Sequence, residues 1–502
     1  MKLSSGMPTG CRCSDKNMSE NYDLIVIGGG SAGLVAAGGA GILGAKVALI
    51  EKNKLGGDCL YTGCVPSKSL IRSAKLANDM KRAEDFGFQI PNFKFKNEDF
   101  ASITNRVQNV IKEIEPHDAP EVFEEMGVEV IFGGAKFLNR NEIEVNLKDS
   151  GETKKIKAKR FCISTGSSPF VPPIEGLKES GFITNEEIFH LKDLPERLIV
   201  LGGGAIGVEM AQAFQRLGAK VSIIEMAEHI LSKEDAEVSA LLEKLLQKEG
   251  VEILTESKAV KVHKNDKGEK VVTIEKDEKT EEITADEVLA AVGRKPNIEN
   301  LELEKAGVKY DKKKIETDEY LRTSQKNIFA AGDVTGHFQF THTADYEAQI
   351  VLQNAFLFYP FTKKTDFRVV PWTTFTEPEV ARVGMTEAEA KKKFGKIKVI
   401  KVPFEENDRA HAEGEIEGFA KIILDGKKIV GAHIVGLRAG ELIHEFVLAM
   451  KLGLSLDDLS KAIHVYPTLS KITQAVATEK TLETLKSPFV QKWFARYLRI
   501  WR

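Results

Sequence analysis

The sequence predicts an α/β protein with two Rossmann-like, three-layer domains and a smaller C-terminal α+β domain. A strand, a glycine-rich turn, a helix and a second strand follow one another from Tyr22, and a near copy of this pattern begins at Leu198. After about Arg368 the composition changes to alternating strands (400–435) and then helices (440–480). At 502 residues and 42% hydrophobic content, the chain is long enough to form several domains.

Both copies carry a glycine motif at the turn from strand to helix. The motif consists of Gly28, Gly30 and Gly33 in the first copy and of Gly202, Gly204 and Gly207 in the second. In each copy a glutamate ends the second strand 23 residues after the first glycine, as Glu51 or Glu225. Such glycines let the backbone approach a pyrophosphate at a helix N-terminus, and the carboxylate binds a ribose hydroxyl. We therefore expect two dinucleotides, one that delivers hydride and one that receives it.

The second copy indicates which nicotinamide cofactor is used. A carboxylate such as Glu225 binds the free 2′-hydroxyl of NAD and repels the 2′-phosphate of NADP, which an arginine would favour. Residues 226–231 contain no Arg or Lys, and Glu228 adds a further negative charge. The sequence therefore predicts NADH in preference to NADPH.

A cysteine pair lies in the stretch GGDCLYTGCVPSKSL. Cys59 and Cys64 are five residues apart, at the start of a predicted helix with Pro66 in its first turn and Lys68 one turn after Cys64. The positive end of a helix favours the reactive thiolate. A zinc site would need two more ligands nearby, and none is present, so no metal site is predicted. The polar, glycine-rich surroundings argue against two inert buried cysteines.

Composition excludes several other classes of protein. With 71 basic and 74 acidic residues the net charge is −3, which gives no overall field for nucleic acid, and five cysteines exclude a disulfide-stapled secreted scaffold. Segment 24–50 is long enough to cross a bilayer, but its eight glycines favour a strand, a turn and a buried helix. Residues 1–20, with Cys11 and Cys13, lack the apolar core of a secretory signal and are predicted to be a disordered leader. We expect a cytoplasmic protein.

The ordered motifs resemble the class I pyridine nucleotide-disulfide oxidoreductases over about residues 21–480. The resemblance rests on GGGSAGL, GGDCLYTGCVPSKSL, STGSSP, GGGAIGVE, AVGRKPN, AAGDV and VPWTTFTEPEVARVG. The Gly-Gly-Asp-Cys form is similar to the mercuric-reductase-like branch of the family, more than to typical dihydrolipoamide dehydrogenases. The resemblance implies FAD on the first Rossmann unit, NAD(P)H on the second, and a homodimer formed through the C-terminal domain.

The resemblance also implies a role for individual residues. Cys64 would be the thiolate stacked on the flavin, and Cys59 the interchange thiol that meets the substrate. Lys68 would lie near flavin N5 and pair with Glu209, beside the nicotinamide. The other implied nucleotide-binding residues are Glu51, Thr165, Gly166 and Asp333 for FAD, together with Gly293 of AVGRKPN.

The resemblance and the changes of composition together predict the domain boundaries. The predicted segments are the leader (1–20), an FAD-binding domain in two parts (21–165 and 294–367), an NAD(P)-binding domain (166–293), a dimerisation domain (368–484) and an amphipathic basic tail helix (485–502).

The chain departs from the family near its C-terminus. Members that handle thiols carry a catalytic His-Pro, with a Glu five residues after the His, whereas Tyr466 and Lys471 occupy these positions here. A tyrosine is a poor general base at neutral pH, and whether His464 replaces the missing histidine stays open. Mercuric reductases carry a C-terminal cysteine pair, but no cysteine follows Cys162 in this chain.

Three hypotheses follow for the function. The first is an FAD- and NADH-dependent oxidoreductase, mercuric-reductase-like, that passes electrons through Cys59 and Cys64 to a metal ion, a quinone or an unidentified disulfide. The second is a dihydrolipoamide dehydrogenase, which Tyr466 and Lys471 disfavour. The third is a non-catalytic flavoprotein redox sensor, which the complete motifs at both nucleotide sites disfavour.

The tail beyond Pro488 predicts a two-faced helix. Aromatic and aliphatic residues, including Trp493 and Trp501, share one face, while Lys492, Arg496 and Arg499 lie on the other. One interpretation is that this helix packs against its own dimer. The other is that residues 488–502 make a peripheral contact with the inner membrane surface.

Overall fold

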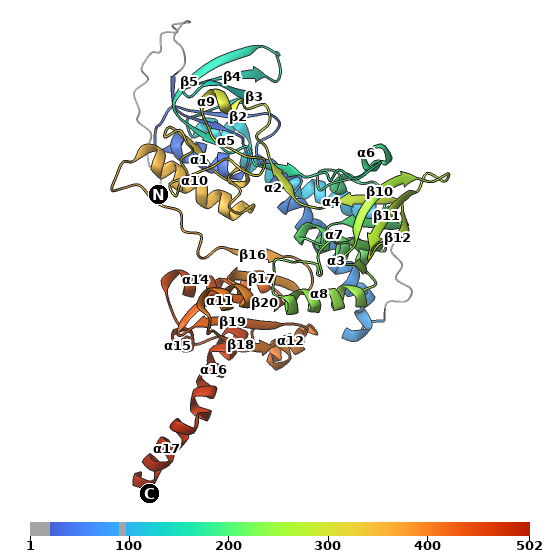
Figure 1. Cartoon of the computed structure of the whole chain (residues 1–502), viewed down its shortest axis with the longest axis vertical. Helices are drawn as coiled ribbons and strands as arrows, with labels where there is room; N and C mark the ends of the chain where they lie inside the picture. The colour runs from blue at the N-terminus through green and yellow to red at the C-terminus, as the bar shows by residue number, and fades with distance from the viewer. Residues whose placement is uncertain (1–20, 90–96, 502) are drawn as a thin grey trace. The chain divides into compact units, whose positions relative to one another are not determined.

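The computed structural model describes residues 21–89 and 97–501, which fold as two compact units (Figure 1). The first unit contains the described residues 21–55, 118–166 and 296–364, and the second contains 56–89, 97–117, 167–295 and 365–501. The cysteine stretch thus belongs to the second unit, whereas the predicted boundaries assign it to the FAD-binding domain. Those boundaries stay a prediction. The predicted leader with Cys11 and Cys13 lies outside the described residues.

The first unit is built on a six-stranded sheet. Its centre is β1 (Asn21–Ile27), which pairs in parallel with β2 (Val47–Glu51) and β5 (Thr153–Ile163). Parallel pairing continues to β3 (Val128–Asn139) and β15 (Ile328–Ala330), while β4 (Glu142–Leu147) runs antiparallel to β3 and β5. The helices of this unit are α1 (Ser31–Ile42), α5 (Pro120–Glu125), α9 (Leu303–Ala306) and α10 (Thr341–Phe356), with the 3₁₀ turn η4 (Asp333–Thr335).

Strand β1 explains why this unit has three layers. Its apolar residues do not alternate with polar ones, because both faces of the strand are buried. Leu24 and Val26 pack with residues of α1 and α10, which lie side by side in Figure 1. Ile25 and Ile27 join a second core on the opposite face, with residues of β3 to β5 and of segment 301–315.

The second unit repeats the Rossmann pattern in a four-stranded parallel sheet, ordered β13-β7-β8-β9. Its strands and helices are β7 (Arg197–Leu201), α7 (Ala205–Leu217), β8 (Lys220–Ile224), α8 (Ala236–Lys248), β9 (Glu252–Leu254) and β13 (Glu287–Ala290). An antiparallel sheet of β10 (Lys258–Lys264), β11 (Lys270–Lys276) and β12 (Lys279–Ala285) accounts for the alternating pattern in residues 251–292. The predicted duplication is therefore present.

The cysteine stretch forms α2 (Gly57–Tyr61) and the start of α3 (Cys64–Lys81). Helix α3 packs on α7 and on α4 (Asn97–Ile114). Phe100 of α4 and Phe214 of α7 place their ring centroids 5.8 Å apart in one shared core. Short elements complete this part: η1 (Ala83–Phe86), η2 (Glu115–Asp118), β6 (Ser167–Pro169), α6 (Leu177–Ser180), η3 (Ile188–His190) and β14 (Arg294–Pro296).

The C-terminal part of the second unit is a five-stranded sheet, ordered β16-β17-β20-β19-β18, and its pairings are antiparallel. Its strands are β16 (Pro371–Thr374), β17 (Glu379–Gly384), β18 (Lys398–Pro403), β19 (Phe419–Asp425) and β20 (Lys428–Gly436). Its helices are α11 (Glu387–Phe394), η5 (Phe404–Glu406), α12 (Asp408–Glu413), α13 (Ala439–Leu442), α14 (His444–Leu452), α15 (Leu456–Leu459), α16 (Lys471–Lys486) and α17 (Pro488–Trp501). The predicted α/β class with a C-terminal α+β domain is confirmed.

Two sequence-based expectations concern membranes and the tail. Among the described residues, no helix is long and apolar enough to cross a bilayer. The tail is helical as predicted, but its first residues belong to α16, because the chain turns extended at Ser487 before α17 begins at Pro488.

Candidate functional site

The first glycine loop is shaped by close contacts within the first unit. Gly28 has φ +106°, and a Cβ there would lie 2.4 Å from the carbonyl oxygen of Ser164. A Cβ on Gly33 would lie 1.8 Å from the oxygen of Gly28. The tight turn therefore requires glycine at both positions. Within the described chain no side chain caps the N-terminus of α1, so its amides can bind a phosphate.

The second loop repeats this geometry and adds an open position. Gly202 has φ +104°, with a Cβ position 2.6 Å from the oxygen of Ala291, and a Cβ on Gly207 would lie 2.0 Å from the oxygen of Gly202. A Cβ on Gly204, in contrast, would meet none of the described atoms within 4 Å. Packing therefore explains two of these glycines. The third leaves space at the N-terminus of α7 where a ligand can approach.

The two glutamates at the strand ends are held by matching hydrogen bonds. The backbone N–H of Gly29 donates to Glu51 Oε2 at 2.7 Å, and that of Gly203 donates to Glu225 Oε2 at 2.6 Å. In both copies the other carboxylate oxygen accepts from the amide two residues further along the chain. Each carboxylate thus lies against its glycine loop, where it can still accept a bond from a ribose hydroxyl.

The remaining predicted FAD contacts of the first unit lie near its loop. Thr165 Oγ1 donates to the backbone oxygen of Asn297 at 2.6 Å, and Gly166, with φ +68°, accepts from the amide of the same residue. Asp333 begins η4 directly after Gly332, whose Cβ position is 3.4 Å from Ala32 in the first turn of α1. The residues of this unit therefore suit a dinucleotide, with the Glu51 carboxylate against the glycine loop and Asp333 directly after a residue that approaches the first turn of α1.

The two cysteines lie on two consecutive helices. Cys59 lies half-buried in α2, and Cys64 is exposed as the first residue of α3. The first turn of α3 contains no acidic residue, so the positive helix end favours the Cys64 thiolate. Cys162 is the opposite case, because burial raises the pKa of its thiol to about 12. Cys59 and Cys64 are therefore accessible thiols, whereas the buried Cys162 is inert.

The loop between the cysteines is fixed by distant residues that the sequence analysis missed. Asp58 accepts hydrogen bonds from the Thr62 hydroxyl at 2.7 Å and from Asn185 Nδ2 at 3.2 Å, and it pairs with Arg294 at 3.2 Å. A Cβ on Gly63 would lie 2.9 Å from the Asp58 oxygen, which explains that glycine. The Gly-Gly-Asp-Cys sequence marks Asp58, but only the fold brings Asn185 and Arg294 to it.

Lys68 and Glu209 form the ion pair that the family resemblance implies. Lys68 Nζ lies 2.9 Å from Glu209 Oε2, and the Glu209 side chain is only 6% exposed. The other oxygen of Glu209 accepts from the backbone N–H of Phe375 at 2.8 Å, while Lys68 Nζ lies 4.4 Å from the centre of the Phe375 ring. These contacts join α3 and α7 to segment 375–377. The sequence analysis did not identify Phe375.

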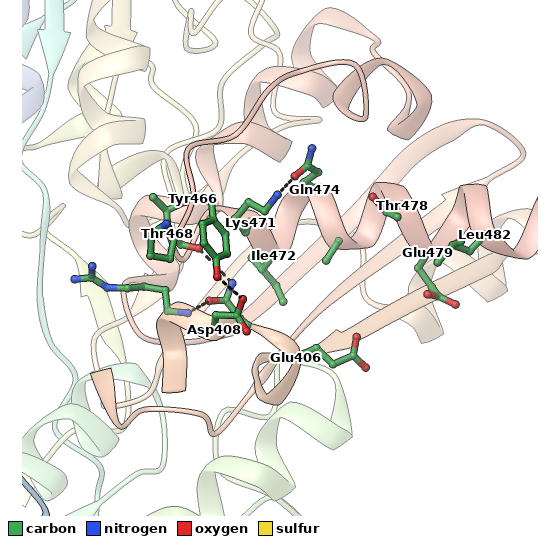
Figure 2. A pocket seen from close by; sticks show the side chains of 14 residues that line it. Glu406, Asp408, Tyr466, Thr468, Lys471, Ile472, Gln474, Thr478, Glu479 and Leu482 are labelled. Atoms are coloured by element: carbon green, nitrogen blue, oxygen red, sulfur yellow. Dashed lines mark hydrogen bonds between the residues drawn. The ribbon is translucent and has the colours of Figure 1, made fainter. Parts of the chain in front are cut away.

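Tyr466 and Lys471 line one cavity of about 260 Å³ in the C-terminal domain (Figure 2). Tyr466 is 66% exposed and donates its hydroxyl to Asp408 Oδ2 at 3.0 Å. This hydrogen bond raises the pKa of Tyr466 above its ordinary value. Lys471 donates to Gln474. The side chain in the position of the family's histidine therefore keeps its proton at neutral pH.

His464 lies apart from the cavity that Tyr466 and Lys471 line. Its side chain is only 8% exposed, with Nε2 3.2 Å from Glu445 Oε2 and Nδ1 3.2 Å from the backbone oxygen of Ala462. It is turned toward α14 and is absent from the lining of the cavity. Within residues 21–89 and 97–501, no group of three His, Cys, Asp or Glu side chains could hold a metal ion.

Comparison with known proteins agrees with this geometry. Residues 22–348 match the family model described as pyridine nucleotide-disulphide oxidoreductase, and residues 370–477 match the model of its dimerisation domain. A mercuric reductase from Staphylococcus aureus is 37% identical over 461 residues, covering 91% of this chain and 82% of that protein. A dihydrolipoyl dehydrogenase from Thermus scotoductus is 38% identical over 459 residues, covering 90% of this chain and 96% of that protein.

A solved structure extends the comparison to the fold. The Cu(II) complex of the HOCl-induced flavoprotein disulfide reductase RclA from Escherichia coli matches with a TM-score of 0.81 and 28% identity. The match covers 91% of this chain and 99% of that one. The motif-based resemblance is therefore confirmed. The chain belongs to the flavin-dependent pyridine nucleotide-disulphide oxidoreductases and carries the dimerisation domain of that family.

Proposed function

We propose that this homodimeric oxidoreductase passes electrons from NADH, through FAD and the Cys59–Cys64 pair, to a soft metal ion. The observation that carries the choice of acceptor is the hydrogen bond from Tyr466 to Asp408, at the position where thiol-handling relatives carry a histidine. A thiol or disulfide substrate needs a group that both gives up and takes back a proton near neutral pH, which the raised pKa of Tyr466 prevents, whereas a metal ion that accepts electrons needs none.

The residues of the two Rossmann units would hold the nucleotides. FAD, when bound, would accept a hydride equivalent from NADH and pass an electron pair to the disulfide. The proposed FAD contacts are Gly28, Gly30, Gly33, Glu51, Thr165, Gly166 and Asp333; those for NADH are Gly202, Gly204, Gly207, Glu225 and Gly293. The Lys68–Glu209 pair would lie beside the reacting atoms, where the lysine charge stabilises developing negative charge.

NADH is proposed in preference to NADPH. The Glu225 carboxylate is fixed against Gly203 by a 2.6 Å hydrogen bond, so it cannot easily turn away from a 2′-phosphate. Glu228 is 82% exposed in the same turn, and His229 lies 3.3 Å from Glu243. The charges around the ribose position therefore favour a neutral hydroxyl.

The cysteine pair would complete the transfer. Two electrons and two protons convert the Cys59–Cys64 disulfide to two thiols. Oxidation of these thiols by one Hg²⁺, or by two Cu²⁺, re-forms the sulfur–sulfur bond, releases two protons and yields Hg⁰ or two Cu⁺. Thiolates are soft ligands that bind such ions, so Cys59 would contact the metal while Cys64 faces the flavin.

The alternative function is that of a dihydrolipoamide dehydrogenase. Relatives of that name match this chain at similar identity. Two observations count against it: the raised pKa of Tyr466, and the position of His464, which is only 8% exposed and lies outside the cavity that Tyr466 lines. A positioned general base contributes roughly 10²–10⁴-fold to the rate, and we expect dihydrolipoamide turnover to be lower by about that factor.

Steady-state NADH oxidation with different acceptors tests this proposal. The panel contains Cu²⁺, Hg²⁺, lipoamide, glutathione disulfide and a quinone, each measured with wild type, Cys59→Ser and a Tyr466→His/Lys471→Glu variant. We expect metal-dependent turnover that Cys59→Ser abolishes and the double variant retains, together with a gain of lipoamide activity in the double variant. Wild-type lipoamide turnover at the level of ordinary dihydrolipoamide dehydrogenases, without metal-dependent turnover, would refute the proposal.

We also propose that the enzyme works in the cytoplasm, with residues 488–502 in peripheral contact with the inner membrane surface. The charge and the aromatic content of α17 support this location.

A further inference from the structure

We infer that α17 is an interfacial helix that binds the surface of an anionic lipid bilayer through its aromatic face. This inference deepens the proposed location but rests on the tail alone, and it does not depend on which acceptor the redox site uses. The family's dimerisation model ends at residue 477, so α17 lies beyond the part of the chain that relatives share through that model.

The apolar face of α17 is exposed. None of its residues is buried against the described parts of the chain, and Phe489 and Trp493 are 79% and 60% exposed. Figure 1 shows α17 at the end of α16, leading to the C-terminus. The rings of Trp493 and Tyr497 stack with centroids 5.9 Å apart, and Tyr497 also contacts Trp501. The face therefore presents a continuous aromatic surface.

The same residues suit the boundary between headgroups and acyl chains. Trp and Tyr combine a large apolar ring with one polar atom, and they gather at this depth in membrane proteins. At 100° per residue, the aromatic and aliphatic side chains of α17 cover about half of the helix circumference. The residues of this face are Phe489, Val490, Trp493, Phe494, Tyr497, Leu498, Ile500 and Trp501.

Charge identifies the partner as an anionic surface. The opposite face carries Lys492, Arg496 and Arg499, and the sequence contains no acidic residue after Glu483. The whole chain, in contrast, has a net charge of −3. A second copy of α17 offers no acidic partner for these basic side chains, whereas acidic headgroups complement them. We therefore assign the face to lipid and not to another copy of the helix.

The test is co-sedimentation of the full-length holoenzyme dimer with vesicles of phosphatidylglycerol and phosphatidylcholine, compared with pure phosphatidylcholine vesicles. We expect binding to the anionic vesicles that weakens with salt, and loss of binding when the chain is truncated after Ser487. Lys492→Glu/Arg496→Glu should weaken binding by roughly tenfold or more. Lys427→Glu/Lys428→Glu, an exposed pair where β19 turns into β20, is the matched control and should bind like wild type.

Two further readouts separate the possible outcomes. NADH oxidation by the truncated protein should equal that of the full-length protein, so loss of vesicle binding cannot be attributed to a damaged redox site. Sedimentation velocity reports the oligomeric state. Equal vesicle binding by full-length and truncated protein would overturn the inference. So would failure of the full-length protein to bind, together with conversion of the truncated protein from dimer to monomer, because α17 would then be a dimer contact.

Discussion

The two glycine loops share their backbone and differ in the helix that follows. Both hold the strand-end glutamate through a glycine amide, at 2.7 Å in the first unit and 2.6 Å in the second. At the position where α7 carries the buried Glu209, the equivalent residue of α1 is Val35. Glu209 binds Lys68 on the cysteine-bearing helix, and α1 has no carboxylate at this position with which to do the same. The duplicated motif thus suits nucleotide binding in both units. One residue of the second copy, Glu209, also connects that copy to the cysteine-bearing helix.

The largest effect is expected when Glu209 of the second copy is replaced by valine, the residue at the equivalent position of the first copy. Glu209→Val removes the acceptor of Lys68 and of the Phe375 amide, so the lysine loses its fixed position. We expect flavin reduction by NADH to slow by on the order of 100-fold, because misplaced groups at a reacting centre cost about that much. Anaerobic stopped-flow absorbance measures this rate. The conservative Glu209→Gln should retain part of the rate, and equal rates for Val and wild type would remove Glu209 from the mechanism.

A second substitution changes the residue expected to contact the NADH ribose and leaves the Lys68–Glu209 ion pair in place. Glu225→Arg replaces the repulsive carboxylate with a partner for the 2′-phosphate, and we expect the ratio of kcat/KM for NADH over NADPH to fall by roughly 10–100-fold. Steady-state assays with both cofactors measure it. Glu228→Arg is the control. Glu228 lies three residues after Glu225 and its side chain is 82% exposed, so this change should shift the ratio less. A wild-type preference for NADPH would contradict the assigned role.

The smallest expected effect separates packing from binding within one loop. Gly207→Ala places a Cβ 2.0 Å from a backbone oxygen and should lower the free energy of unfolding by about 1–3 kcal/mol. Gly204→Ala meets no described atom within 4 Å and should leave stability unchanged while raising the KM for NADH by about tenfold. Thermal unfolding and cofactor titration of both variants measure the two effects. Destabilisation by Gly204→Ala would show that packing, and not the ligand, requires that glycine.

Local patterns predicted much of the molecule. Both Rossmann units, the helix start at Cys64 and the helical tail could be read from the order of apolar residues, glycines and the proline at position 66. These features depend on neighbours in the sequence, so a single chain is enough to identify them.

The contacts around the cysteines could not be predicted in the same way. Asn185 and Arg294 reach Asp58 across more than one hundred residues, and Phe375 reaches Glu209 from the C-terminal domain. Tyr466 likewise meets Asp408 only in the fold, so its raised pKa has no signature in the local sequence. Long-range polar partners depend on how separate elements pack, and the sequence pattern does not encode these distances.

The most direct test of the account follows the cysteines during reduction. Anaerobic titration of the purified dimer with NADH should produce a long-wavelength charge-transfer band between a thiolate and the flavin. Cys64→Ser should abolish this band, Cys59→Ser should retain or enhance it, and Cys162→Ser should leave it unchanged, since that thiol is buried with a pKa raised to about 12. A band that survives in both Cys59→Ser and Cys64→Ser would contradict the assignment of the electron path to this pair.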